Sequence, residues 1–238
     1  MTHRRLARSF AAVAAEYERG RPDWPEAILD AVPVAPASSV LDLGAGTGKL
    51  TRVLARRYAS VVAVEPLAEL RSILAATVPA ATALEGRAEA IPLPDGALDA
   101  VFAAQSFHWF AHDEAVAEIA RVLRPTGVLA VLWNEPHPTA PKATPAAYLE
   151  RLEQLHEEAA PPEIDWDVLR RGGFGDVHDA HVDHQQLSTR ADVLALAASV
   201  SWIAVRPDSQ AVLAELAELL PEGEYRFTWR ANVRWARR

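Results

Sequence analysis

The sequence of 238 residues contains no cysteine, which excludes disulfide bonds and thiol chemistry within this chain. No hydrophobic run approaches the roughly 18 residues of a membrane span, and the basic first ten residues lack an apolar segment typical of a secretory signal. We therefore expect a cytoplasmic protein. A net positive charge is also lacking: the formal charge of −8 argues against nucleic acid or an anionic membrane as a partner.

Half of the residues are hydrophobic and about a quarter are charged, which is ordinary for a globular protein of this length. We expect a single domain over residues 1–238 with three parts. Residues 1–37 form a helical preface, residues 38–134 a ligand-binding half, and residues 135–238 further helices and strands. The preface could act as a lid over a ligand, or it could simply pack on the sheet.

The stretch from Ser38 to Thr51 organises the rest of the chain. Its apolar start predicts a strand over 40–43. The glycines that follow at alternate positions (Gly44, Gly46, Gly48) predict a tight turn that a ligand can approach closely. The next helix would direct its free N–H groups and positive end toward that ligand. The spacing G-x-G-x-G is neither the dinucleotide fingerprint nor a phosphate loop, in which Ser or Thr would replace Leu50.

An acidic residue, Glu65, ends the next apolar strand at 61–64. In two-strand nucleotide folds a carboxylate at this position accepts hydrogen bonds from both vicinal hydroxyls of a ribose. The alternative for Glu65 is a solvent-exposed glutamate at a strand end. The alternative for the three glycines alone is a turn in another kind of α/β protein.

Apolar periodicity predicts the remaining elements. Helices are expected at 2–18 (ended by Gly20), 25–32, 67–77, 112–123, 146–158, 190–200 and 208–219, and strands near 81–85, 98–104, 128–133, 176–186 and 225–236.

The run from Val40 to Gly48 resembles the first motif of class I methyltransferases that use S-adenosylmethionine (SAM). Glu65, an Ala88–Glu89 turn and the segment Gln105–Phe110 follow in the order typical of that family. The resemblance implies a Rossmann-like α/β fold: a seven-stranded, mostly parallel sheet with an antiparallel last strand, helices on both faces and an N-terminal helical lid. Where the family usually has Pro-Gly-Gly before the fifth strand, this chain has Thr126 in place of the first glycine.

Further segments resemble the small-molecule branch with the type-11 methyltransferase domain, which includes trans-aconitate methyltransferase-like enzymes. They are the aromatic preface with Arg21-Pro-Asp-Trp-Pro, the phrase Gln-Ser-Phe-His-Trp-Phe, and Trp133-Asn134. The resemblance implies SAM as cofactor and S-adenosylhomocysteine as product. The implied cofactor-binding residues are Tyr17, Arg21, Asp42, Gly44, Ala45, Gly46, Gly48, Glu65, Pro66, Ala88, Glu89, Gln105 and Ser106.

Several of these residues also have an ordinary structural interpretation. Ala88 would offer its amide and Glu89 its side chain to the adenine, but Glu89 could instead stabilise a helix start. Arg21 could bind the methionine carboxylate of SAM or an acidic acceptor, or form a surface salt bridge.

The acceptor side carries fewer signals. His108 follows the fourth strand and is the candidate general base, unless it only shapes the pocket through a backbone partner. Candidate acceptor-binding residues are Phe10, Trp24, His108, Trp109 and Trp133, with core packing as the alternative for the aromatic ones. No metal site is expected, because His178, His181 and His184 alternate between the faces of a strand.

The predicted function is transfer of the SAM methyl group to a small-molecule acceptor, at oxygen, nitrogen or carbon and including a carboxylate, by in-line displacement. Two alternatives remain open: a SAM-binding enzyme of the same fold without methyl transfer, such as a cyclase or decarboxylase, and a non-enzymatic SAM sensor. A monomer and a homodimer are both compatible with the sequence.

Overall fold

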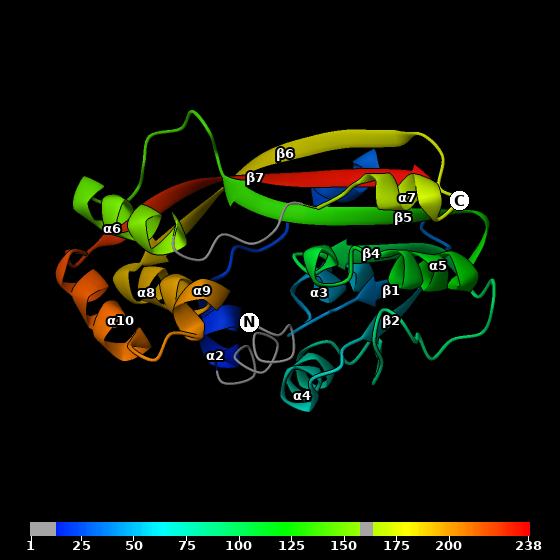
Figure 1. Ribbon diagram of the computed structural model, residues 1–238, viewed down its shortest axis with the longest axis horizontal. Coiled ribbons are helices and arrows are strands. Elements are labelled where there is room, and N and C mark those ends of the chain that lie inside the picture. Colours follow the sequence, from blue (N-terminus) through cyan, green and yellow to red (C-terminus); the bar gives the residue numbers. More distant parts are fainter. Residues whose placement is uncertain (1–12, 158–163) are drawn as a thin grey trace. The chain divides into compact units, whose positions relative to one another are not determined.

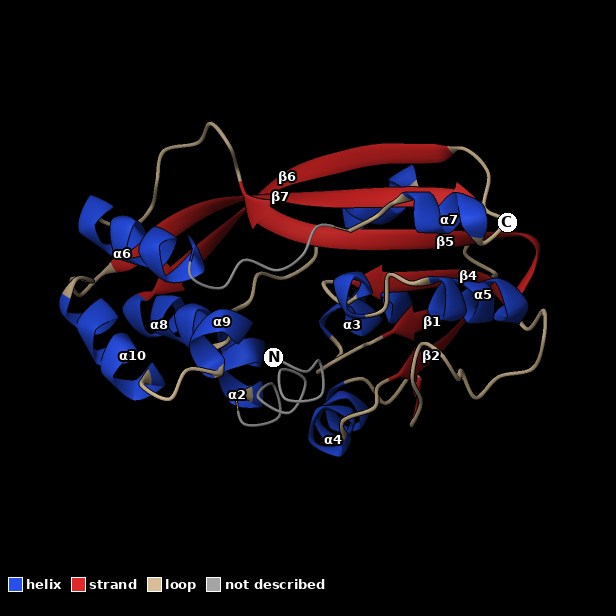
Figure 2. Ribbon diagram, viewed as in Figure 1, coloured by secondary structure: helices blue, strands red, loops and turns tan. Residues whose placement is uncertain are grey.

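The computed structural model describes residues 13–157 and 164–238 (Figures 1 and 2). Most of the expected helix at 2–18, and Phe10 with it, lies outside these residues. The helices are α2 (Ala14–Gly20), η1 (Glu26–Ala31), α3 (Lys49–Arg57), α4 (Ala68–Thr77), η2 (Phe107–Trp109), α5 (Asp113–Val122), α6 (Ala146–Glu157), α7 (Asp167–Arg171), α8 (Arg190–Ala198), α9 (Ser201–Ala204) and α10 (Ser209–Glu218). The strands are β1 (Ser39–Leu43), β2 (Ser60–Val64), β3 (Thr82–Leu84), β4 (Leu98–Ala104), β5 (Leu123–Pro136), β6 (Val177–Thr189) and β7 (Glu224–Arg237).

The seven strands form one sheet in the order β3-β2-β1-β4-β5-β7-β6. The first five are parallel, with β1 between β2 and β4. The strand β7 lies between β5 and β6 and is antiparallel to both. Its end meets the start of β5, where the Arg238 amide donates to the Gly127 carbonyl, and it also meets the residues just before β6, where the Gly175 amide donates to the Arg237 carbonyl. The expected mostly parallel sheet with an antiparallel last strand is confirmed.

Both faces of the sheet are covered, as the continuous apolar strands predict. Along β4, Val101 and Ala103 face a buried cluster that includes the apolar sides of α5 and α7. The alternate residues Ala100 and Phe102 face a second cluster, with η1 and α3. The carboxyl ends of these parallel strands are therefore left to form a site.

The chain divides into two compact units. The sheet unit comprises Asp23–Glu135, Glu163–Val182 and Arg230–Arg238, and the helical unit comprises Met1–Pro22, Pro136–Pro162 and Asp183–Trp229. The helical unit has its own core, with Tyr148, Val193, Ile203 and Leu216 among its buried residues. The organisation as a single functional domain with a mobile lid stays a prediction. Among the described helices, none has both the length and the apolar composition needed to cross a membrane.

Gly20 is the last residue of α2, so the helix ends at the glycine that the sequence predicts. The glycine also has a packing role, because a Cβ on it would come within 2.1 Å of the backbone nitrogen of Leu196 in α8. Glycine thus lets the two helices of the helical unit touch. Beside this contact, Arg19 forms an ion pair with Asp192 at 2.6 Å.

The turn into β5 also differs from expectation. The strand begins at Leu123 rather than near residue 128, and its pairing with β4 shifts register between Leu98 and Ala100. Within this irregularity Thr126 has a φ of 69°, in the left-handed region that favours glycine. This explains why glycine commonly occupies the position.

Replacing Thr126 with glycine should stabilise the protein. The left-handed conformation costs an ordinary residue on the order of 1–2 kcal/mol, which the entropy of glycine in the unfolded chain offsets by roughly half. We expect Thr126→Gly to raise the free energy of unfolding by about 0.5–1 kcal/mol and Tm by about 1–4 °C. Thr126→Ala, which keeps the strain, is the control in the same thermal scan. Equal Tm values for the two variants would contradict the strain argument.

Candidate functional site

The loop between β1 and α3 turns through its three glycines, each with a positive φ of 69°, 59° and 89° at Gly44, Gly46 and Gly48. The amides of Gly44 and Ala45 both donate to the Val64 carbonyl at the end of β2, at 2.9 and 3.1 Å. The Gly46 amide donates to the Glu65 carboxylate. These amides therefore stabilise the loop itself.

The three glycines of the loop differ in how much room a Cβ would have at each position. A Cβ on Gly44 would lie 2.8 Å from Ser106 Cβ, and one on Gly48 would lie 3.1 Å from the side chain of Leu74. A Cβ on Gly46 would have no atom within 4 Å. The loop thus has tight packing at its two ends and an open approach to the backbone at its centre.

Glu65 borders this open position. Its residue is only 5% exposed, and its two oxygens accept from the amides of Gly46 and Leu67, each at 2.9 Å. Burial raises the pKa of the Glu65 carboxyl, and the two amides oppose that rise. A carboxylate oxygen can accept two hydrogen bonds, so each retains capacity for a ligand hydroxyl.

Asp42 on β1 is buried below the loop. Its Oδ2 accepts from the Thr51 hydroxyl of α3 at 2.6 Å, and its Oδ1 has no hydrogen-bond partner among the described residues. Burial raises the pKa of Asp42 to about 7, the Thr51 bond opposes this, and the charge of nearby Glu65 adds to it. The unpaired oxygen and the open loop fit a polar ligand at this end of the sheet.

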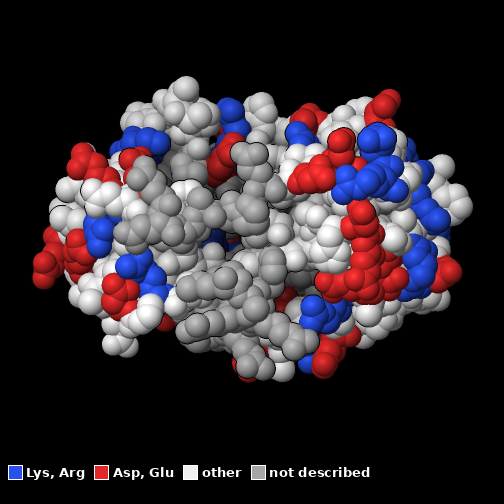
Figure 3. Space-filling view, in the orientation of Figure 1, with Lys and Arg blue, Asp and Glu red and all other residues white. Residues whose placement is uncertain are grey.

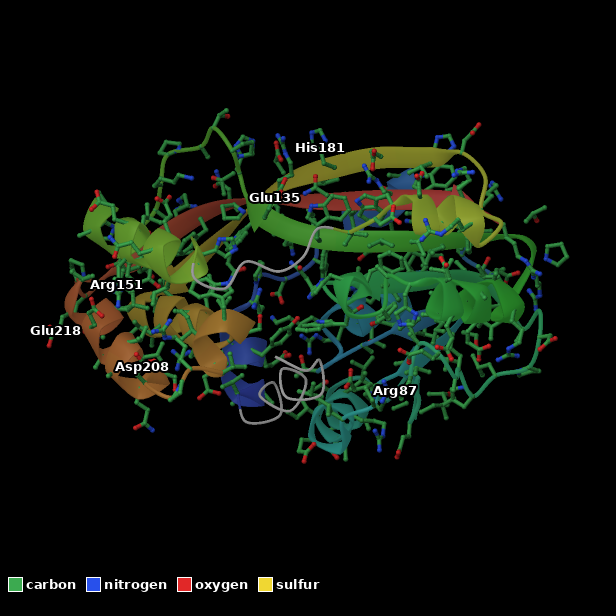
Figure 4. All side chains as sticks on the ribbon, viewed as in Figure 1. Arg87, Glu135, Arg151, His181, Asp208 and Glu218 are labelled. Atoms are coloured by element: carbon green, nitrogen blue, oxygen red, sulfur yellow. The ribbon has the colours of Figure 1, made fainter. Side chains whose placement is uncertain are left out.

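The expected adenine turn follows β3. Ala88 is buried, while Glu89 bonds Arg87 and His112 of the same unit, each at 3.3 Å. Arg87 is labelled in Figure 4. The carboxylate of Glu89 is thus already engaged, as in the structural alternative, and its contact with adenine stays a prediction. Pro66 is exposed beside Glu65, and its cofactor role is likewise untested.

The segment after β4 connects the loop to a second feature. Gln105 has a φ of 53°, in the left-handed region, and its amide group donates to the Asn134 carbonyl at 3.0 Å. The Ser106 hydroxyl donates to the Leu43 carbonyl at 2.9 Å. Both side chains are therefore held by the ends of neighbouring strands.

A cavity of about 410 Å³ lies beside this segment, within the sheet unit. Its lining residues come from the ends of β4 and β5 and from the chain before α7: Gln105, Ser106, Phe107, His108, Val131, Leu132, Trp133, Ile164 and Trp166. Ser106 belongs to the cavity and also packs against Gly44, so the cavity adjoins the glycine loop.

The predicted acceptor residues separate in the structure. His108 and Trp133 line the cavity. The Trp109 ring contacts the ring of His108 at a tilt of 45°, with ring centroids 4.7 Å apart, and packs against the core cluster of α5. Trp24 is 7% exposed in the cluster of η1 and α3, so its contacts are those of a core residue.

Sequence reasoning missed Trp166 and Ile164, which sit in a segment without regular periodicity. The Trp166 ring stacks on Phe107 at 5.8 Å and lies 6.2 Å from Trp133. The Arg234 guanidinium of β7 lies 4.4 Å from the Trp166 ring centroid. The only available signal was the aromatic residue itself.

Tyr17 and Arg21 belong to the helical unit. Arg21 donates to the hydroxyl and the carbonyl of Ser199, at 2.9 and 3.1 Å, and its guanidinium lies 5.3 Å from the Tyr17 ring centroid. Burial lowers the pKa of Arg21. The arginine thus joins α2 to the end of α8, and its role toward a cofactor carboxylate stays a prediction.

In the described part of the chain, no cluster of three or more His, Cys, Asp or Glu side chains could hold a metal ion. His181, labelled in Figure 4, lies on β6. Its neighbour His178 stacks on Trp235 with ring centroids 4.1 Å apart.

The buried Asp42 predicts a pH-dependent stability. Its folded pKa of about 7 exceeds its ordinary value of 3.8, so between these values the unfolded chain releases a proton that the folded protein keeps. The stability that Asp42 contributes is full below pH 3.8 and is lost as the pH rises to about 7. The slope is about 1.4 kcal/mol per pH unit.

Asp42→Asn removes this proton while keeping an acceptor for Thr51. We compare the free energy of unfolding of the variant with that of the wild type. We expect this difference to favour the variant by about 2–3 kcal/mol more at pH 8 than at pH 5. Denaturant unfolding at both pH values measures this, with the exposed Asp176→Asn as the matched control. A gain that does not change with pH would refute the raised pKa.

Comparison with known proteins identifies the family to which the chain belongs. A family model described as a methyltransferase domain matches residues 41–131, which includes the glycine loop, Glu65 and the segment after β4. An uncharacterized methyltransferase of Mycobacterium tuberculosis (strain ATCC 25618 / H37Rv) is 48% identical over 133 residues, 56% of this chain and 55% of the relative. The chain thus spans about half the length of the first curated relatives that it matches.

Other relatives extend the similarity. An uncharacterized methyltransferase-like protein of Schizosaccharomyces pombe is 32% identical over 230 residues, 90% of this chain and 88% of the relative. A trans-aconitate 2-methyltransferase of Azoarcus sp. is 31% identical over 146 residues, 58% of this chain and 57% of that protein.

A solved structure from Anaeromyxobacter dehalogenans, provisionally assigned as a type II methyltransferase, has a TM-score of 0.70 and 28% identity. The match covers 91% of this chain and 97% of that one. The matches to the Schizosaccharomyces pombe relative and to this structure each cover about nine-tenths of the chain. The chain therefore belongs to the SAM-dependent methyltransferase family with a Rossmann-like fold.

Proposed function

We propose that this chain transfers the methyl group of SAM to a small-molecule acceptor bound in the cavity of the sheet unit. One observation carries the proposal: Ser106 lines the cavity and also lies against Gly44 of the cofactor loop. A ligand on the loop and a ligand in the cavity would then be neighbours at the carboxyl ends of β1 and β4, where open α/β sheets bind their ligands.

The loop residues fit the cofactor that the family uses. The open space over Gly46 admits a ligand to the backbone, and Glu65 lies beside it with acceptor capacity for two vicinal hydroxyls. Asp42 adds a buried carboxyl behind the loop. These residues bind and orient the cofactor without further rearrangement, because protein amides already fix the Glu65 carboxylate.

SAM supplies a methyl group that its sulfonium already activates. The chain has to orient an acceptor in line with that methyl group and exclude water, which can contribute on the order of 7–11 kcal/mol. The indoles of Trp133 and Trp166 cover the cavity with apolar surface. His108, at its edge, would take a proton from an acceptor that arrives protonated.

The proposed partner is the small-molecule acceptor, with neither nucleic acid nor membrane. On the face shown in Figure 3, basic and acidic side chains are interspersed over the described part of the sheet unit, which supports this choice. The cytoplasmic location and the choice between monomer and homodimer stay predictions.

Calorimetric titration with SAM tests the cofactor site. Glu65→Gln keeps the shape but presents an amide in place of two acceptors, so we expect the Kd for SAM to rise about tenfold to a hundredfold. The matched control is Glu85→Gln, because the Glu85 side chain is 75% exposed and pairs with Arg71. Absence of SAM binding by the folded wild type would refute the proposal.

Transfer itself needs a second measurement. Incubation with SAM labelled in its methyl group and a panel of small acceptors should give a labelled product in the wild type and much less in Glu65→Gln. Tight SAM binding without transfer to any acceptor would favour the alternative of a SAM-binding protein that does not methylate.

A further inference from the structure

We infer that the cavity selects a flat, largely apolar acceptor with one ionisable hydroxyl, such as a phenol or an enol, and rejects polycarboxylates. This inference rests on the proposed function and specifies its substrate class. Six of the nine lining side chains are apolar or aromatic: Phe107, Val131, Leu132, Trp133, Ile164 and Trp166. No Lys, Arg, Asp or Glu is among the lining residues that the structure describes.

The aromatic rings favour a planar ligand. Trp166 is the central ring: it lies nearly parallel to Phe107, with 16° between their planes, and is tilted by 38° to Trp133. The Phe107–Trp166 stack and the tilted Trp133 ring together give the cavity an aromatic wall, against which another ring gains contact area. An extended, flexible acid would leave much of this surface without contact.

The polar groups that reach the cavity are few and mostly engaged. Ser106 donates its hydroxyl proton to the Leu43 carbonyl, and Gln105 donates from its amide group to the Asn134 carbonyl. A polycarboxylate in the cavity would lose its hydration without a cation to replace it, which disfavours its binding. A single hydroxyl needs only one or two hydrogen bonds.

The nearest guanidinium does not change this conclusion. Arg234 lies over Trp166, but its Nε and Nη2 atoms both bind the carboxylate of Asp179, at 2.7 and 2.9 Å. This bidentate ion pair compensates the positive charge within the protein. The remaining effect of Arg234 is to position the Trp166 indole through a cation–π contact from β7.

Methyl transfer to a hydroxyl requires an acceptor for its proton and a leaving group for the methyl carbon. The acceptor O–H proton passes to an imidazole nitrogen of His108, and the acceptor oxygen forms a bond to the methyl carbon of SAM. The C–S bond breaks and its electron pair stays on sulfur, giving S-adenosylhomocysteine. Among the lining residues that the structure describes, His108 alone carries an imidazole, which can act as a general base.

Calorimetry with three acceptor probes tests the selectivity: 2-naphthol, 2-naphthoate and tricarballylate, each with S-adenosylhomocysteine present and absent. The first two share a ring and differ in charge, and the third is a polycarboxylate without a ring. We expect 2-naphthol to bind at least about tenfold more tightly than 2-naphthoate and tricarballylate not to bind. Binding of tricarballylate as tight as that of 2-naphthol would overturn the inference.

Two variants locate the binding. Trp166→Leu should weaken 2-naphthol about tenfold and leave the Kd for SAM unchanged, whereas Trp202→Leu, in the helical unit, should change neither. Ile164→Lys places a cation on a half-exposed wall of the cavity, where the fold tolerates it, and should make 2-naphthoate the tighter ligand. Unchanged preferences in both cavity variants would show that the probes bind elsewhere.

His108→Asn tests the proton step. With labelled SAM, its rate on 2-naphthol should fall about a hundredfold, because the general base is lost. The loss should be much smaller for 2,4-dinitrophenol, which arrives already ionised. Equal losses for both acceptors would overturn the assignment of the hydroxyl proton to His108. Since the probes also bind without SAM, failure of the cavity inference and failure of the cofactor proposal are distinguishable.

Discussion

The hydrogen bond from the Gly46 amide to the Glu65 carboxylate joins the two parts of the chain on which the site depends. It connects the turn after β1 to the end of β2, next to the bonds that the Gly44 and Ala45 amides make to Val64. Because β1 and β2 are adjacent and parallel, their carboxyl ends meet and only a short loop is needed. The carboxylate is thereby oriented before any ligand arrives, which lowers the entropic cost of binding.

This arrangement places two buried carboxyl groups, Asp42 and Glu65, at the ends of neighbouring strands. Burial raises the pKa of each, and the charge of Glu65 adds to the rise at Asp42. Thr51 compensates one carboxyl and backbone amides the other, but Oδ1 of Asp42 remains without a partner among the described residues. Such a cost in stability is typical of a binding site, where groups serve a ligand rather than the fold.

The cofactor half could be predicted because its signals are local. Strand alternation, glycine spacing and the acidic residue after β2 each lie within a few residues, and the parallel topology brings them together. The packing role of Gly20 and the position of Trp24 could not be predicted in this way: tertiary packing against α8 decides the first, and the core of η1 and α3 decides the second. Trp166 gave no periodic signal, since it reaches the cavity from a short segment before α7.

The two halves of the site therefore depend on different physical constraints. Gly44 and Gly48 both have a positive φ, and a Cβ would come within 2.8 Å of Ser106 at the first position and within 3.1 Å of Leu74 at the second, so the fold itself favours glycine in the cofactor loop. Ile164 and Trp166 are half-buried on the short segment before α7, and neither has a backbone conformation that requires glycine. The backbone of the loop therefore indicates the family, whereas the side chains that line the cavity determine which acceptor binds. The charge and shape of the cavity wall are thus the features from which the acceptor is inferred.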